Sequence, residues 1–152
     1  MATSVQHRHT RPRLARGDTG IAILEFALIL PVLAVLVFGT IDLGRAFSLK
    51  SSVTNMAREG AFQLVVDACP LSKAKDAAKA ENAELSSKVT VKIVPGTNTS
   101  APEVTCPANG VFPSGTELTV VVTTKMSIIA PLVGVITGDP VNVTGTATAR
   151  MP

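Results

Sequence analysis

The sequence predicts an α+β fold in which one long N-terminal helix packs on a small, antiparallel, three-stranded sheet. Two observations predict this fold. Apolar residues fill positions 21–41 and then recur at spacings of three and four residues up to about Val66, which is the pattern of a helix. Three later segments, residues 89–94, 118–124 and 141–149, alternate apolar and polar side chains, which is the pattern of half-buried strands.

The apolar run from Ile21 to Ile41 is long enough to cross a membrane, because about 20 apolar residues in a helix span a bilayer core about 30 Å thick. Apart from Thr40 at its far end, the run holds one polar residue, Glu25. An acidic side chain costs about 2.5–3.5 kcal/mol at the centre of a membrane helix and less near its end. We therefore expect Glu25 to have a partner or a specific role.

Residues 1–20 form a basic leader. They hold four arginines and one acid, Asp18, which account for the whole net charge of +3. Basic flanks stay in the cytoplasm, so the leader predicts a cytoplasmic N-terminus and an exported domain, residues 42–152. We expect no metal site at His7 and His9, which have no further ligands near them. Since the rest of the chain has no excess of basic residues, we expect no nucleic-acid partner.

The helical pattern continues beyond the membrane segment, which Asp42 and Arg45 close on its outer side. From Leu43 to Val65 the apolar residues form one stripe, so we expect this amphipathic half to pack on the exported domain. Small residues in this helix either allow close helix approach or are simply tolerated, and they are Gly39, Gly44 and Gly60.

Between the long helix and the strands, residues 72–85 are rich in Ala, Lys and Glu and predict a short amphipathic helix with Ser72 as its cap. A second apolar stretch, residues 127–138, is too short to span a membrane. We expect it to form a short helix between the last two strands, buried against the sheet. If it is exposed instead, it marks a contact surface for another subunit or for the bilayer.

The chain contains two cysteines, Cys69 and Cys106, each followed by proline. In an exported domain they predict one structural disulfide, because the space outside the cytoplasm is oxidising. Such a bond would close a long loop, for which the chain-entropy model gives about 3–4 kcal/mol. Free thiols are the alternative.

The order of a basic leader, Gly20, Glu25 as the fifth residue after it, and then Phe26 and an apolar tail resembles a class III, prepilin-like signal. The longer run E-F-A-L-I-L-P-V-L-A-V-L-V-F-G-T-I-D-L-G-R-A-F, continuing into V-T-N-M-A-R-E-G-A, resembles the TadE-like family of pseudopilins. This family belongs to the tight-adherence (Flp) pilus assembly systems of bacteria. The likeness covers about residues 17–61, and the ending A-T-A-R also fits it.

The resemblance implies a pilin-like fold and a role for each residue of the signal. A prepilin peptidase would cut after Gly20 and leave Ile21 with a free ammonium, which the Glu25 carboxylate of a neighbouring subunit would meet. Such pairing offsets the cost of burying a lone charge. Phe26 belongs to the same assembly segment, and Pro31 predicts a kink that either helps subunits leave the bilayer or has no role. The implied partners are that peptidase, other pilin-like subunits, the pilus assembly machinery and membrane lipids.

The sequence shows few of the residue patterns that are typical of an enzyme active site. After residue 20 there is no histidine, so the exported part cannot build a His-based triad or a His-containing zinc site, and no Gly-rich phosphate loop stands out. We expect a non-catalytic pseudopilin with no cofactor and no metal. Its rivals are an uncleaved single-pass membrane anchor that presents an extracytoplasmic binding domain, and an exported enzyme.

Overall fold

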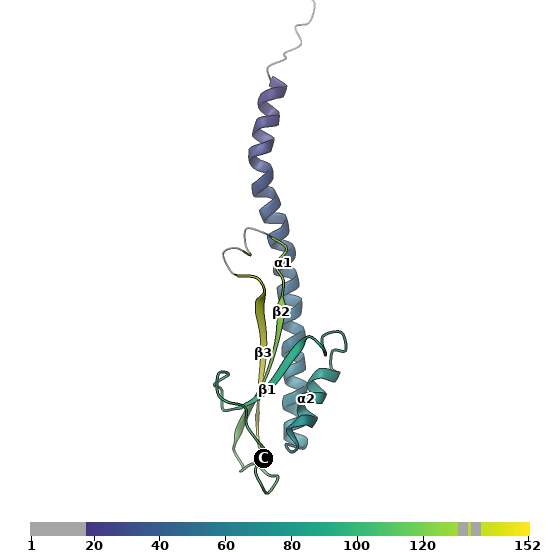
Figure 1. Cartoon of the computed structure of the whole chain (residues 1–152), viewed down its shortest axis with the longest axis vertical. Helices are drawn as coiled ribbons and strands as arrows, with labels where there is room; N and C mark the ends of the chain where they lie inside the picture. The colour runs from purple at the N-terminus through teal and green to yellow at the C-terminus, as the bar shows by residue number, and fades with distance from the viewer. Residues whose placement is uncertain (1–17, 131–133, 135–137) are drawn as a thin grey trace, which may run out of the picture. The chain divides into compact units, whose positions relative to one another are not determined.

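A computed structural model describes residues 18–130, 134 and 138–152, so most of the leader, with His7 and His9, lies outside the described residues. The elements are α1 (Asp18–Val66), α2 (Leu71–Ala80), β1 (Val89–Pro95), β2 (Glu117–Met126) and β3 (Val141–Arg150) (Figure 1). The predicted α+β fold is confirmed. The chain divides into two compact units, Met1–Leu36 and Val37–Pro152, and the sheet and α2 belong to the second.

α1 is a single helix of 49 residues that continues through Pro31 and ends at Val66, where the sequence pattern predicts its end. Among the described residues, one helix, Gly20–Val66, is long and apolar enough to cross a membrane by length and composition. The first half of α1 therefore has the properties expected of a membrane segment. The kink at Pro31 stays a prediction.

The three strands form one antiparallel sheet in the order β1-β2-β3, as the alternating segments predict. The register places Ile93, Val120 and Ala147 side by side across the sheet. β2 is the central strand, and its side chains are mostly buried on both faces. The observed strands extend the predicted ones by no more than two residues at either end.

The core of the second unit lies between the second half of α1, α2 and one face of the sheet, which flank each other in Figure 1. Helix side chains meet strand side chains in one apolar cluster, which confirms that the helix stripe packs on the sheet. Its largest fully buried members are Val53, Met56, Leu64, Ile93, Leu118, Val120 and Val122.

Two glycines allow elements of this unit to approach closely. A Cβ atom built on Gly145 of β3 would lie 2.5 Å from the Val53 carbonyl oxygen and the Thr54 nitrogen, so a side chain cannot fit there. A Cβ on Gly60 of α1 would lie 3.0 Å from the Ala74 oxygen of α2. Gly60 therefore serves close helix approach inside the second unit, whereas Cβ atoms at positions 39 and 44 would meet none of the described residues.

α2 differs from the predicted helix 72–85 at both ends. Its cap is Pro70, and Ser72 lies inside the first turn, so the predicted Ser72 cap is wrong. The helix ends at Ala80 because the following polar side chains bond locally to the backbone and compete with the helix. The Leu85 nitrogen donates to Asn82 Oδ1 at 3.2 Å, which stabilises a turn in place of the predicted last helical turn.

Candidate assembly site

The first turns of α1 carry the residues of the predicted signal. Gly20 and Ile21 lie just inside the N-terminal end of the helix, and Glu25 lies one turn after Ile21 on the same face. The side chains of Ile21, Glu25 and Phe26 are all exposed. No hydrogen bond or ion pair joins the Glu25 carboxylate to another described residue. The structure thus places these residues on one short, exposed helical segment.

The apolar surface around this segment is also uncovered. The large apolar side chains between Ile21 and Ile41 are at least 37% exposed, which is the value for Val35, and Leu28 reaches 71%. An exposed apolar surface of this size marks contact with lipid or with another protein. The chain's own described residues do not provide that contact.

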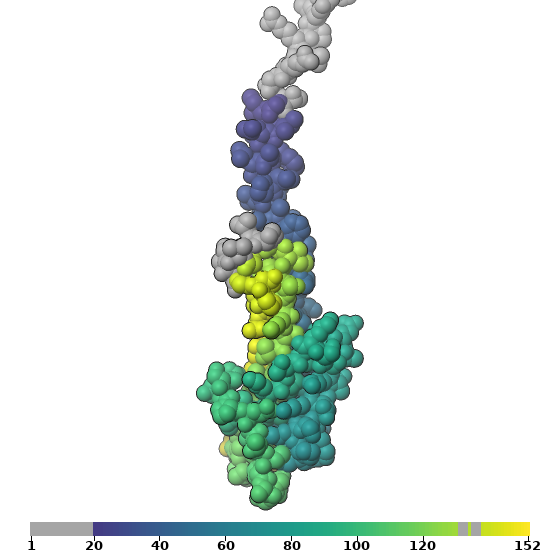
Figure 2. Space-filling view, in the orientation of Figure 1, coloured from purple at the N-terminus to yellow at the C-terminus, as the bar shows by residue number. Residues whose placement is uncertain are grey.

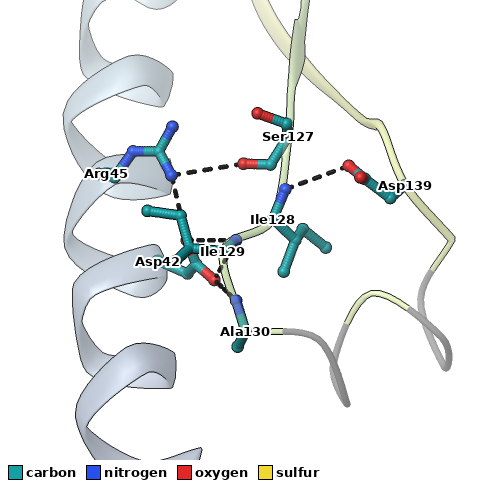
Figure 3. Close-up of polar contacts among 7 residues, drawn as sticks. All are labelled: Asp42, Arg45, Ser127, Ile128, Ile129, Ala130 and Asp139. Carbon is teal, nitrogen blue, oxygen red and sulfur yellow. Dashed lines mark hydrogen bonds and ion pairs between the residues drawn. The ribbon is translucent and has the colours of Figure 1, made fainter.

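A second cluster of polar contacts lies where the apolar run ends (Figure 3). Asp42 is only 7% exposed, and its Oδ2 accepts the backbone N–H groups of Ile129 at 2.9 Å and Ala130 at 2.8 Å. Arg45 Nη1 donates to Asp42 Oδ1 at 3.2 Å. This carboxylate therefore fixes the connection between β2 and β3 to α1.

The sequence assigned Asp42 and Arg45 only to the end of the membrane segment and missed this contact. The partner amides lie 87 and 88 residues further along the chain, so no local pattern reveals them. The available signal was a lone aspartate directly after an apolar run, which needs a partner if it is buried. The expected short helix within residues 127–138 falls largely on positions 131–133 and 135–137, which lie outside the described residues.

The comparison with protein families covers the start of α1 and the α1 residues of the second cluster, Asp42 and Arg45. Residues 20–61 match the family described as TadE-like protein. This confirms the resemblance, and the family points to a protein associated with tight-adherence pili. The TadE-like segment, residues 20–61, begins at Gly20 and contains Glu25, Phe26 and Pro31. No curated protein and no solved structure matches the chain.

The disulfide lies outside the TadE-like segment. Cys69, just after α1, is bonded to Cys106 in the loop between β1 and β2, with the two Cα atoms 6.0 Å apart. An ion pair between Lys75 of α2 and Glu103 joins the same loop to α2, and both parts lie side by side in Figure 2. These links attach a long irregular loop to the helical layer. The predicted pairing of the two cysteines is thus present in the structure.

The described residues show no group of three or more His, Cys, Asp or Glu side chains that could hold a metal ion. The matched family is a pilus-associated structural family that is not known for enzymatic activity. The site has exposed apolar surface, one unpaired carboxylate and a helix terminus. This arrangement suits association between helices.

Proposed function

We propose that this protein is a pilin-like subunit, a pseudopilin, of a tight-adherence pilus or a related secretion system. It is inserted in the membrane, does not catalyse a reaction and assembles through α1. The observation that carries the proposal is the match of residues 20–61, which begins at the proposed cleavage residue and includes Glu25.

Assembly follows from charge and apolar contact at the start of α1. Cleavage after Gly20 leaves an ammonium on Ile21, and each subunit then carries one new cation and one acid, Glu25, at the same end. In a low-dielectric bundle an unpaired charge is costly, whereas a close pair offsets much of that cost. Pairing the amine of one subunit with the carboxylate of its neighbour satisfies both charges and sets the stagger between helices.

The proposed topology places the leader in the cytoplasm and the domain with the sheet outside it. The arginines of the leader support this orientation. The disulfide between Cys69 and Cys106 supports it independently, because disulfides persist in oxidising compartments and are rare in the cytosol.

Mass spectrometry of the native protein tests the proposal. We expect the mature chain to begin at Ile21, and we expect Gly20→Val to block its maturation because a branched side chain occupies the cleavage position. Gly39→Val is the matched control, since at both positions a Cβ atom would meet none of the described residues. A native chain that still begins at Met1 would refute processing and favour an uncleaved anchor with an extracytoplasmic binding domain.

A further inference from the structure

The connection from β2 towards β3 meets α1 next to the end of the apolar run. Asp42 is the first residue after that run, and its carboxylate accepts hydrogen bonds from the backbone N–H groups of Ile129 and Ala130. We propose that a membrane foot, defined as Ile41, Leu43 and Ile129, enters the outer boundary of the bilayer beside α1. This inference rests on the proposed function, because it requires residues 21–41 to span the membrane.

Exposure of the foot residues supports this contact. Ile41, Leu43 and Ile129 are 47%, 71% and 50% exposed within the chain. Ile41 and Leu43 flank Asp42 on α1, and Ile129 is held to Asp42 by hydrogen bonds to both carboxylate oxygens, at 2.9 and 3.1 Å. The foot therefore begins at Ile41, the last residue of the apolar run, and the connection from β2 adds Ile129 to it.

Three successive backbone N–H groups in the connection between β2 and β3 have hydrogen-bond acceptors, as a low-dielectric environment requires. Residues 128–130 are not helical, so their N–H groups have no helical partners. Asp139 Oδ1 accepts the Ile128 N–H at 3.1 Å, and Asp42 accepts the next two. Irregular backbone at membrane depth is tolerated only where it is buried in protein or lines a water-filled cavity. At the boundary of the bilayer its polar groups still need partners, because an unsatisfied group in lipid costs several kcal/mol. Two aspartates meet this requirement for three successive amides (Figure 3).

Arg45 provides the polar boundary above the foot. It follows Ile41 by about one helical turn on the exported side, and its side chain is 43% exposed. Its Nη1 reaches both Asp42 and the Ser127 carbonyl oxygen, the latter at 3.4 Å. Arginine side chains near the ends of membrane helices keep their charge at headgroup level while their carbons lie along apolar surface. Along α1, the apolar foot comes first and the Arg45 cation follows it. In a bilayer the acyl chains come first and the headgroups follow them, so the two orders match.

A single-tryptophan experiment tests the foot, because the chain contains no Trp and no Tyr. The full chain with Ile129→Trp is reconstituted at a low protein-to-lipid ratio into phosphatidylcholine vesicles whose acyl chains are brominated near the headgroup. We expect bromine to quench this tryptophan. Val111→Trp is the matched control, since Val111 is 65% exposed on the loop between β1 and β2, and we expect no quenching there.

A third variant separates the two proposals. Leu33→Trp lies within the apolar run, and bromine in mid-chain positions should quench it if α1 spans the bilayer. If Leu33→Trp is not quenched, the membrane-spanning part of the proposed function fails and the foot fails with it. If Leu33→Trp is quenched but Ile129→Trp is not, only the foot is overturned. A blue-shifted but unquenched Ile129→Trp would assign this surface to a neighbouring subunit and overturn lipid contact.

The anchoring role of Asp42 has its own readout. Asp42→Ala in the Ile129→Trp background removes both carboxylate oxygens and should reduce quenching at position 129. The same change in the Leu33→Trp background should leave quenching there unaltered, because the helix still spans the bilayer. Undiminished quenching at position 129 would refute the anchoring role.

Discussion

The two halves of α1 present similar side chains to different surroundings. Between Ile21 and Ile41 the large apolar side chains are exposed, whereas in the second half Val53, Met56 and Leu64 are at most 1% exposed. Both halves belong to one continuous helix, which is apolar at nearly every position in the first half and at spacings of three and four residues in the second. The second half is buried by α2 and the sheet of its own chain, while the first half has no such cover among the described residues.

The two halves of α1 therefore have different roles: burial of the second half contributes to folding, and covering of the first half contributes to association. Burial of apolar surface in the second half of α1 stabilises the second unit whether or not a membrane or a partner protein is present. The same kind of surface in the first half gains free energy only when lipid or a neighbouring subunit covers it. Substitutions in the first half should therefore change association, and substitutions in the second half should change the free energy of unfolding.

The largest expected effect is on assembly, from Glu25→Ala. We expect the variant to be cleaved like the wild type but to be lost from the assembled structure, because the neighbour's ammonium then has no acid to meet. The measurement is the mature fraction and the incorporated fraction of the subunit, by immunoblot of membrane and sheared-filament samples.

Glu59→Ala is the control for Glu25→Ala, since Glu59 is an exposed acid in the second half of the same helix. It should be incorporated normally. Normal incorporation of the Glu25 variant would contradict the charge-pairing model, and loss of both variants would show a general sensitivity of α1 to acid removal.

Two leucines, one in each half of α1, test whether the two halves have different roles. Leu64 is 1% exposed and Leu28 is 71% exposed. Leu64→Ala should lower the free energy of unfolding by about 2–5 kcal/mol, because it removes buried methyl groups and leaves a cavity. Leu28→Ala should leave the free energy of unfolding of the second unit, Val37–Pro152, unchanged. Guanidinium unfolding of the full chain in detergent, followed by circular dichroism, measures the free energy of unfolding of both variants. An equal loss of stability in the two variants would refute the assignment of different roles to the two halves of α1.

A pair of glycines gives a smaller contrast. Gly145→Ala should cost about 1–3 kcal/mol, the usual range for overpacking, because its Cβ would press on the backbone of Val53 and Thr54. Gly44→Ala meets none of the described residues and should be neutral or mildly stabilising in a helix. The same denaturation assay applies. An unchanged midpoint for Gly145→Ala would mean that β3 does not approach α1 as closely as the structure shows.

The smallest expected effect concerns pH. Lys73 Nζ donates to Asp67 Oδ2 at 2.5 Å, and this hydrogen bond lowers the pKa of the Asp67 carboxyl below 3.8. Because the folded-state pKa is lower than the unfolded one, the contact stabilises the fold above pH 3.8, and the contribution is lost as pH falls through the folded-state pKa.

We therefore expect Lys73→Ala to be slightly less stable than the wild type at neutral pH, with the difference vanishing in strong acid. The urea midpoints of the two proteins, measured from neutral pH down to strong acid, show the effect. Lys79→Ala, on the same helix, should show no such pH-dependent difference; a Lys73 effect that persists in acid would point to packing instead of charge.

Local pattern was enough to predict much of the fold. Periodicity of apolar residues predicted the end of α1 at Val66 and the three strands, because burial on one side of an element imposes its own spacing on the sequence. With only two cysteines present, the disulfide between Cys69 and Cys106 had a single possible pairing within the chain. The segment around Gly20 and Glu25 was recognisable because its residues are close together in sequence.

Other features depend on contacts that sequence spacing does not encode. Asp42 accepts hydrogen bonds from amides 87 and 88 residues further along the chain. Position 145 requires glycine only because β3 lies against the backbone of α1 there. α2 ends early because the Asn82 side chain bonds to Leu85, a competition between two local alternatives that propensity did not resolve. Long-range burial and hydrogen bonding appear only once the chain is folded, since they depend on which surfaces meet in space.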